Sequence, residues 1–294
     1  MPKLVIPLEL AGQRLDRALV RLLPEESRSR LARLIGEGHV LVDGRAVAAS
    51  LKLRSGETVE VALAPRPADA AHRPEAIDLP VVHEDASLLV IDKPAGLVVH
   101  PGSGNWSGTM LNALLHHAPG VADLPRAGIV HRLDKDTSGL LVVAKDEATQ
   151  LALVRQLQAR SVKRTYLALV RGKVAAGGTI DAPIGRHPVQ RTRMAVVAGG
   201  RPAVTHYRVR RRFPAHTLLE CDLETGRTHQ IRVHLASIGH PLEGDPVYAG
   251  KARGAFRRQA LHAWKLAFVH PGTGKTVRFE SPLPADFEAL LEGL

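Results

Sequence analysis

Residues 128–145 read Gly-Ile-Val-His-Arg-Leu-Asp-Lys-Asp-Thr-Ser-Gly-Leu-Leu-Val-Val-Ala-Lys and join a charged segment to a purely apolar one. The apolar run Leu140–Ala144 directly follows a glycine and is typical of a buried strand. The segment 131–136 holds a histidine, two aspartates, an arginine and a lysine, which predicts a loop attached to that strand. Loops on rigid scaffolds often carry catalytic groups. The alternative is an ordinary turn, because Asp, Thr, Ser and Gly are common turn formers.

The net charge favours a polyanionic partner. The chain has 294 residues, a formal charge of +11 and a sequence pI of about 10.3. Strongly basic proteins usually bind nucleic acid. Eight arginines and no acidic residue lie between positions 182 and 219, which favours a phosphate-contacting surface over a solvated basic face. They are Arg186, Arg191, Arg193, Arg201, Arg208, Arg210, Arg211 and Arg212.

The composition also excludes several classes. Aromatic residues make up only 3%, so recognition of a folded RNA by shape and charge is favoured over stacking on single strands. No apolar run reaches 18 residues, and Cys221 is the single cysteine, so we expect no membrane helix, no disulfide framework and a cytoplasmic protein. His229 and His234 lie five residues apart without a glutamate in the zinc-protease position, so no metal site is expected.

Residues 1–63 form a first predicted domain. Apolar spacing predicts helices over 14–23 and 28–37, the second capped by Ser27, and strands follow at 40–42 and 58–63. The phrases Gln-Arg-Leu-Asp-Arg-Ala-Leu and Ser-Arg-Ser-Arg-Leu resemble the S4 RNA-binding domain. We expect three arginines of the second helix to face outward and bind RNA; the alternative is a small α+β module with a solvated face. They are Arg28, Arg30 and Arg33.

Residues 64–80 are rich in proline and alanine and show no periodicity, which predicts a linker. The second domain then covers residues 81–294. Its patterns predict strands over 88–91, 140–144, 165–170, 204–212, 217–223, 261–269 and 276–280, and helices over 109–118, 147–159, 228–238 and 284–291. Mainly antiparallel strands in a mixed sheet with flanking helices define an α+β fold.

The second domain resembles the pseudouridine synthases that modify uridines in structured RNA, the group typified by the large-subunit ribosomal RNA enzymes. His-Arg-Leu-Asp-Lys-Asp-Thr-Ser-Gly-Leu at 131–140 is similar to their catalytic signature, and the segments 92–97 and 225–232 are similar to further motifs. The resemblance implies isomerisation of uridine to pseudouridine. That reaction is redox neutral, so no cofactor and no metal are expected.

The resemblance also implies residue roles. It places the catalytic carboxylate on Asp134, which would either add to a sugar carbon or take a sugar proton. It implies that Arg232 pairs with this carboxylate, that Tyr166 packs against the target base, and that Arg132 fills the RNA stack when the uridine leaves. Asp136 would point the opposite way on an extended loop. From the basic cluster, Arg191 and Arg193 are further candidates for substrate binding.

The expected substrate is ribosomal RNA of the large subunit or its precursor particle, because residues 119–131, 184–187 and 201–207 resemble the members that act there. We expect a monomer with no membrane partner. Three alternatives remain open from the sequence. They are a non-catalytic ribosomal RNA-binding or assembly factor, a synthase acting on a different RNA such as tRNA, and a hydrolase that releases free uracil.

Overall fold

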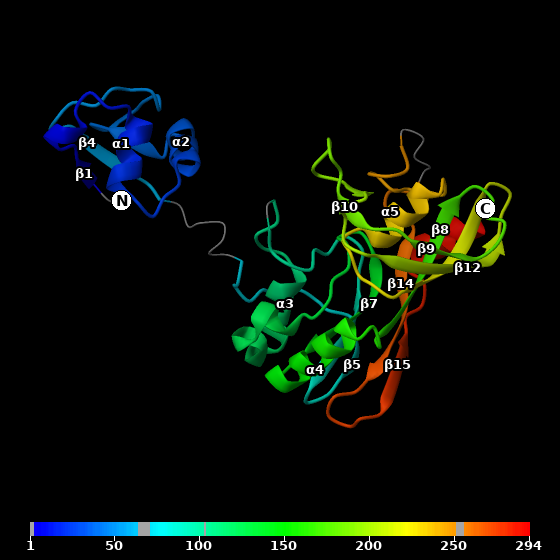
Figure 1. Cartoon of the computed structure of the whole chain (residues 1–294). Coiled ribbons are helices and arrows are strands. Elements are labelled where there is room, and N and C mark those ends of the chain that lie inside the picture. The colour runs from blue at the N-terminus through cyan, green and yellow to red at the C-terminus, as the bar shows by residue number, and fades with distance from the viewer. Residues whose placement is uncertain (1–2, 64–70, 103, 251–255) are drawn as a thin grey trace. The chain divides into compact units, whose positions relative to one another are not determined.

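The computed structural model describes residues 3–63, 71–102, 104–250 and 256–294. Contacts divide the chain into two compact units, Met1–Ala70 and Ala71–Leu294 (Figure 1). Each unit has its own hydrophobic core. Across the described residues, no helix could span a membrane.

The first unit is a four-stranded antiparallel sheet covered by two helices. Its strands lie in the order β1-β4-β2-β3. The bounds are β1 Lys3–Val5, the short 3₁₀ helix η1 Leu8–Leu10, α1 Leu15–Leu22, α2 Arg28–Gly36, β2 Val40–Val42, β3 Arg45–Ala46 and β4 Thr58–Val61. Both predicted helices are confirmed, as is the cap, because the Ser27 hydroxyl accepts from the Arg30 amide at 3.3 Å. Leu19, Leu31 and Leu34 bury the helical stripes against the sheet.

The second unit is built on a nine-stranded mixed sheet in the order β5-β6-β7-β14-β8-β13-β12-β9, with β15 paired to β14. Only the β7–β14 pair is parallel among these described strands. The strands are β5 Val81–Glu84, β6 Leu88–Lys93, β7 Ser138–Ala144, β8 Lys163–Arg171, β9 Gly178–Asp181, β12 Val204–Arg212, β13 His216–Leu223, β14 Leu261–Val269 and β15 Thr276–Glu280. A separate hairpin pairs β10 Ile184–Arg186 with β11 Met194–Val196.

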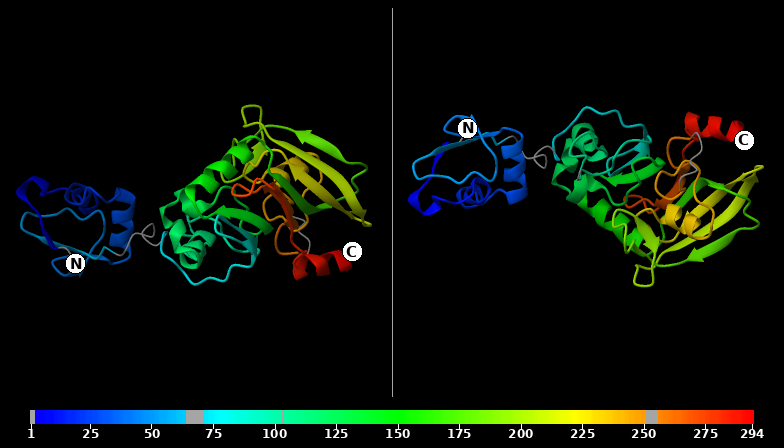
Figure 2. Two further views of the ribbon diagram at one scale, coloured as in Figure 1. Left: turned by 90° about the horizontal axis from the view of Figure 1, so that it is seen from below. Right: turned by 90° about the horizontal axis from the view of Figure 1, so that it is seen from above.

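Helices cover both faces of this sheet, as the views of Figure 2 show. They are α3 Met110–His117, α4 Glu147–Gln158, α5 Gln230–Ser237 and α6 Ala285–Glu292, with short 3₁₀ helices η3 Pro119–Asp123 and η4 Pro125–Gly128. On β6, Leu89 joins the core of α3, whereas the adjacent Leu88 joins the core of α4. On β13, Leu219 and Leu218 divide in the same way between α5 and α6. This alternation is the period of two that a strand imposes, and it confirms the predicted α+β class.

The structure differs from the predicted organisation in two places. The expected linker 64–80 falls partly outside the described residues, but its end packs on α3: Asn112 Nδ2 donates to the Ala71 and Arg73 carbonyls at 3.3 and 2.8 Å, and the Glu75 amide donates back to Asn112. The end of the expected linker is therefore fixed to the second unit by these hydrogen bonds and by burial of the Ala71 side chain, although its sequence shows no periodicity. Six short strands were not predicted, because two to four residues give no readable pattern; they are β1, β3, β5, β9, β10 and β11.

Gly139 brings two strands of the sheet unusually close together. Its φ is +110°, and a Cβ built there would lie 2.6 Å from the Ala263 amide nitrogen and nearer still to the Ala263 carbonyl oxygen. These contacts occur where β7 and β14 run parallel, with Gly139 registered against Ala263. Only a residue without a side chain fits this pairing.

We predict that Gly139→Ala lowers the free energy of unfolding by about 3 kcal/mol or more, because positive φ and overpacking each cost on the order of 1–3 kcal/mol. Urea denaturation measures the loss. The matched control is Gly120→Ala, since Gly120 has ordinary φ and nothing within 4 Å of the added methyl. Equal stability of the two variants would contradict the proposed close approach.

Candidate active site

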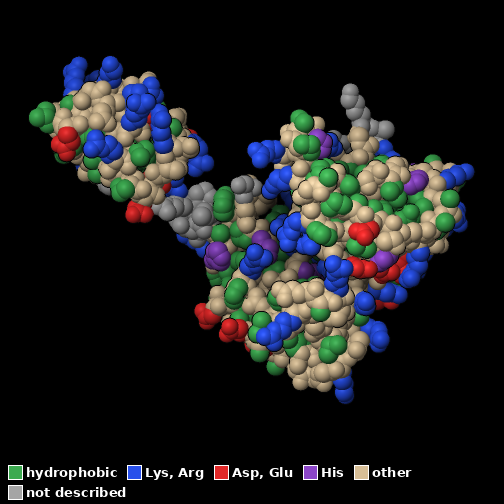
Figure 3. All heavy atoms as spheres, in the orientation of Figure 1, with side chains coloured by type: hydrophobic (Ala, Val, Ile, Leu, Met, Phe, Trp, Pro, Cys, Tyr) green, Lys and Arg blue, Asp and Glu red, His purple; other side chains and the backbone are tan. Residues whose placement is uncertain are grey.

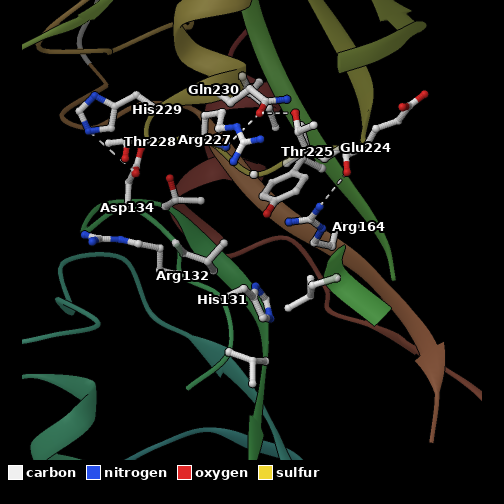
Figure 4. A pocket seen from close by; sticks show the side chains of 18 of the residues that line it. His131, Arg132, Asp134, Arg164, Glu224, Thr225, Arg227, Thr228, His229 and Gln230 are labelled. Carbon is white, nitrogen blue, oxygen red and sulfur yellow. Dashed lines mark hydrogen bonds and ion pairs between the residues drawn. The ribbon is translucent and has the colours of Figure 1, made fainter. Parts of the chain in front are cut away.

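A pocket of about 800 Å³ opens beside the loop that the charged motif forms (Figure 4). One wall is the segment 129–134, a second is β8, and a third is the segment 223–232 that leads into α5. Lys and Arg side chains gather around the hollow on the face of the second unit that Figure 3 shows. Asp134, Arg132, Tyr166 and Arg232 all line this pocket, so the fold brings together four candidates from three separate parts of the sequence.

Arg232 joins two carboxylates at the base of the pocket. Its Nη1 donates to Asp134 Oδ2 at 2.9 Å, while Nε and Nη2 donate to the two oxygens of Asp245 at 2.8 and 3.0 Å. Asp245 is fully buried, and the Asp134 side chain retains one-fifth of its exposure. Burial alone would lower the pKa of Arg232, but the two carboxylates raise it above its ordinary value. The guanidinium is therefore charged and fixed in place.

Asp245 is the residue of this site that the sequence did not predict. Burial opposes its charge, but hydrogen bonds from Arg232 hold the pKa of Asp245 below its usual value. Its Oδ1 also accepts from the amides of Val247 and Tyr248 at 2.8 and 3.0 Å. An aspartate commonly stabilises a turn by such hydrogen bonds to the backbone amides that follow it. No spacing in the sequence marks this residue, because its partnership with Arg232 exists only in the tertiary structure.

His229 and Tyr248 enclose the other side of Arg232. The Arg232 guanidinium carbon lies 5.2 Å from the centre of the Tyr248 ring. The Tyr248 hydroxyl is 2.9 Å from His229 Nδ1, and His229 Nε2 is 3.9 Å from Asp134 Oδ1. Burial lowers the pKa of His229, so its imidazole is neutral near pH 7. Arg232 is thus the charged partner of Asp134.

Gln230 fixes the segment that carries Arg232. Its side-chain amide donates to the Val204 carbonyl at 2.9 Å and to the Thr205 hydroxyl at 3.0 Å. Its carbonyl oxygen accepts from the Thr225 hydroxyl at 2.7 Å and from the Arg227 amide at 3.0 Å. This buried amide therefore ties the first turn of α5 to the end of β12, and it sets where α5 begins.

Lys93 fixes the loop that carries Asp134. Its side chain has 0% exposure, and Nζ donates to the carbonyls of Pro94, Leu97 and Lys135 at 2.8, 3.0 and 2.9 Å. Burial lowers the pKa of Lys93 to about 7. The Thr137 amide closes the loop by donating to the Asp134 carbonyl at 3.1 Å, and Asp136 is not among the residues that line the pocket.

Tyr166 lies on β8 and presents its ring to the pocket. The side chain is buried, and burial raises the pKa of its phenol. The hydroxyl is therefore protonated at neutral pH and suited to ring contact or hydrogen-bond donation rather than to taking a proton. Arg132, by contrast, is exposed at the pocket wall.

The remaining candidate substrate-binding residues do not line the pocket. Arg28 donates to Asp16 at 2.7 Å, and Arg30 lies 3.2 Å from Glu26. The expectation that Arg30 faces outward is wrong, because its side chain is only 14% exposed. Arg33 is exposed beside Glu37.

Arg191 and Arg193 lie in the connection between β10 and β11. Arg191 is exposed, and Arg193 donates to the Gln190 side chain at 2.8 Å and stacks 5.6 Å from the Tyr248 ring. Arg201 of the predicted basic cluster does line the pocket. Sequence reasoning missed four further arginines of the lining, which are Arg126, Arg160, Arg164 and Arg227. Only Arg164 carried a readable signal, since it lies two residues before Tyr166 on one strand.

Fold and site together define an enzyme that acts on RNA, and comparisons identify its family. The chain belongs to the RNA pseudouridylate synthase family, whose sequence profile matches residues 87–237, and an S4 domain profile matches residues 13–59. Both resemblances seen in the sequence are thereby confirmed.

Two relatives are similar over nearly the whole chain. The Ribosomal large subunit pseudouridine synthase D of Nitrosomonas europaea is 58% identical over 99% of this chain and 87% of that protein. The protein of the same name from Pseudomonas aeruginosa is 54% identical over 97% of this chain and 93% of that protein. Among solved structures, Human RNA Pseudouridylate Synthase Domain Containing 1 is 27% identical with a TM-score of 0.60, covering 71% of this chain and 85% of that one.

We predict that Asp245→Ala lowers the free energy of unfolding by about 3–5 kcal/mol, because it removes one partner of a buried ion pair. Chemical denaturation of the whole chain measures this. Asp123→Ala is the control, since Asp123 is exposed. A loss no larger than that of the control would show that Arg232 is held by other contacts.

A second prediction concerns pH and the first unit. Hydrogen bonds from Arg14 and Arg28 lower the pKa of Asp16 to about 2, from an ordinary value of 3.8. A lowered folded-state pKa stabilises the fold above the unfolded value, so this contribution is lost as pH falls from about 4 to about 2. Urea midpoints followed by NMR signals of residues 3–63 will show this loss, and Asp16→Asn will reduce it. An identical pH dependence in both proteins would contradict the assignment.

Proposed function

We propose that this protein converts specific uridines of large-subunit ribosomal RNA into pseudouridine, with Asp134 as the catalytic carboxylate. The observation that carries the proposal is an ion-paired carboxylate, 2.9 Å from Arg232, in a pocket whose lining also carries several further arginines. The family and the names of the two bacterial relatives support the reaction and the RNA.

The reaction breaks the bond from N1 of uracil to C1′, turns the base and forms a bond from C5 to C1′. Asp134 begins it by adding to C1′ or by taking a sugar proton. Arg232 needs no movement to serve the reaction, because Asp245 holds the other edge of its guanidinium. A charge placed in advance stabilises the transition state without reorganisation.

Tyr166 and Arg132 would act on the base and on the gap it leaves. The Tyr166 ring lies on the pocket wall formed by β8, where it would pack against a flipped uracil. Arg132 is exposed at the pocket, so its planar guanidinium would occupy the vacated stack. Extruding a base costs a few kcal/mol of stacking and pairing, and this replacement would recover part of that cost.

The first unit would supply additional RNA affinity. Arg33 is exposed on α2, while Arg28 and Arg30 already contact Asp16 and Glu26. RNA phosphates would compete for these arginines, so their net contribution is smaller than three free cations would give. The exposed Arg191 of the β10–β11 connection, with Arg193 beside it, is placed to contact RNA outside the pocket.

We further propose a cytoplasmic monomer that binds no membrane. Residues of a single chain form every wall of the described pocket, so a second copy is not needed to complete it. A ribosomal RNA substrate also places the reaction where ribosomes assemble, which in bacteria is the cytoplasm.

The test is pseudouridine mapping on unmodified large-subunit RNA and on assembled subunits. We expect new pseudouridine with the wild type, and at least about 100-fold slower formation with Asp134→Asn, because loss of a catalytic proton-transfer group typically costs 10²–10⁴-fold. Asp123→Asn is the matched control at an exposed site.

Three outcomes would contradict the proposal. No product with any protein on any ribosomal RNA would favour a binding protein or a different RNA. Full activity of Asp134→Asn would remove the assigned role of Asp134. Release of free uracil would indicate a hydrolase.

A further inference from the structure

Arg164 is a buried cation on the pocket wall that the reaction described so far does not use. It lies two residues before Tyr166 on β8, and side chains two apart point to the same face of a strand. Both residues line the pocket, and the Arg164 side chain is only 8% exposed. Figure 4 shows its guanidinium pointing toward the segment that carries Glu224 and Thr225.

The Arg164 guanidinium has almost no partner in the free protein. Its one hydrogen bond within the described chain is a long one, from Nη2 to the Glu224 carbonyl oxygen at 3.5 Å. Its Nε is buried and has no hydrogen-bond partner among the described residues. No carboxylate of the described residues lies within ion-pair distance of Arg164.

Glu224, whose backbone carbonyl accepts the long hydrogen bond from Arg164, does not neutralise the Arg164 charge with its carboxylate. Both carboxylate oxygens of Glu224 are engaged elsewhere, with Arg160 at 2.8 Å and with His206 at 2.8 Å. The neighbouring His131 is neutral, since its Nε2 accepts from the Val142 amide at 3.1 Å. Burying a cation without a counter-ion is costly, so this arrangement is expected only where a ligand supplies the missing acceptors.

The surroundings are shaped for the guanidinium and carry positive charge. A Cβ at Gly226 would lie 2.7 Å from Arg164 Nη1, so the glycine leaves the space that Arg164 occupies. Arg160, Arg201 and Arg227 line the same pocket. Burial lowers the pKa of Arg227, and the positive charges of Arg201 and Arg160 lower it further. The positive charge of this wall therefore favours binding of a negatively charged group. A uracil carbonyl is uncharged and would not neutralise these arginines.

We propose that Arg164 is a positioning residue that binds a phosphodiester group adjoining the target uridine. This inference rests on the proposed function. A planar guanidinium can donate to two phosphate oxygens at once, and Arg164 lines the pocket with a single long hydrogen bond of its own among the described residues. Holding the backbone here would fix the sugar opposite Asp134 while the released base turns. Fixing a reacting centre in this way is a recognised source of rate enhancement.

The test combines Arg164→Met with short RNA substrates in which a methylphosphonate replaces one phosphate beside the target uridine. We expect Arg164→Met to weaken binding of the unmodified RNA by about 10-fold or more, as loss of a charged hydrogen bond does. One methylphosphonate position should weaken binding by the wild type to a similar extent. The two changes together should cost no more than either alone, because both remove the same contact.

Two further variants keep the result interpretable. Arg278→Met changes an exposed arginine on β15 outside the pocket and should bind both RNAs as the wild type does. Arg164→Lys keeps the charge without the planar edge and should retain part of the affinity. In the absence of RNA, Arg164→Met should melt at the same or a higher temperature than the wild type, because an apolar side chain of similar length replaces an unpartnered cation.

Additive losses from the variant and every methylphosphonate would overturn the inference, since Arg164 would then contact another part of the RNA. Unchanged affinity of Arg164→Met, or a lower melting temperature without RNA, would overturn it as well. Pseudouridine formation is followed in the same samples. Failure of the wild type to form pseudouridine would refute the proposed function. An active wild type with an unaffected Arg164→Met would refute this inference alone.

Discussion

Arg232 holds both sides of the site together, because its guanidinium pairs with two carboxylates, one buried in the protein and one facing the pocket. Asp245 is buried and takes two of its donors, and Asp134 faces the pocket and takes the third. Each of the three guanidinium nitrogens of Arg232 donates to a carboxylate, which holds the side chain in one position. Asp134 therefore meets a cation whose position is set by the fold rather than by substrate. Removing that cation would leave two carboxylates near each other and would remove the hydrogen bonds that hold this part of the pocket in place.

The rest of the pocket divides its charges in a related way. At one end a carboxylate has its cation, while at the other Arg164 has no carboxylate and Glu224 is turned toward Arg160 and His206. The neutral His131 adds no compensating charge to that end, because it accepts a backbone hydrogen bond. In the free protein the buried charge of Arg164 is therefore unfavourable. It lies on the side of the pocket where a polyanion would enter, and binding of that polyanion would relieve this unfavourable energy. The same unpaired arginine thus lowers the stability of the free protein and raises its affinity for a polyanion.

Much of the fold was predictable because its strands and helices are long or strongly patterned. The apolar run of β7, the apolar stretch of β8 and the two strands β12 and β13 are each long enough to be recognised, and their positions were predicted correctly. Asp245 could not be found, since its role depends on a contact with Arg232, from which the end of α5 and an irregular segment separate it. Likewise the sequence suggests that Arg30 is a surface cation, and only the folded structure shows that its side chain is largely buried and paired with Glu26. The roles of Asp134, Tyr166 and Arg232 came from resemblance, and the structure adds their proximity.

The position of β14 within the sheet has a consequence for how the protein matures. This strand is inserted between β7 and β8, although it follows both by about a hundred residues in the chain. The partners Asp134 and Arg232 are themselves 98 residues apart. Such non-local pairing forms late, after most of the chain is available. A nascent chain that has not yet released β14 from the ribosome carries the Asp134 loop without the sheet that orders it. Synthesis of the enzyme and the onset of its activity are thereby separated in time.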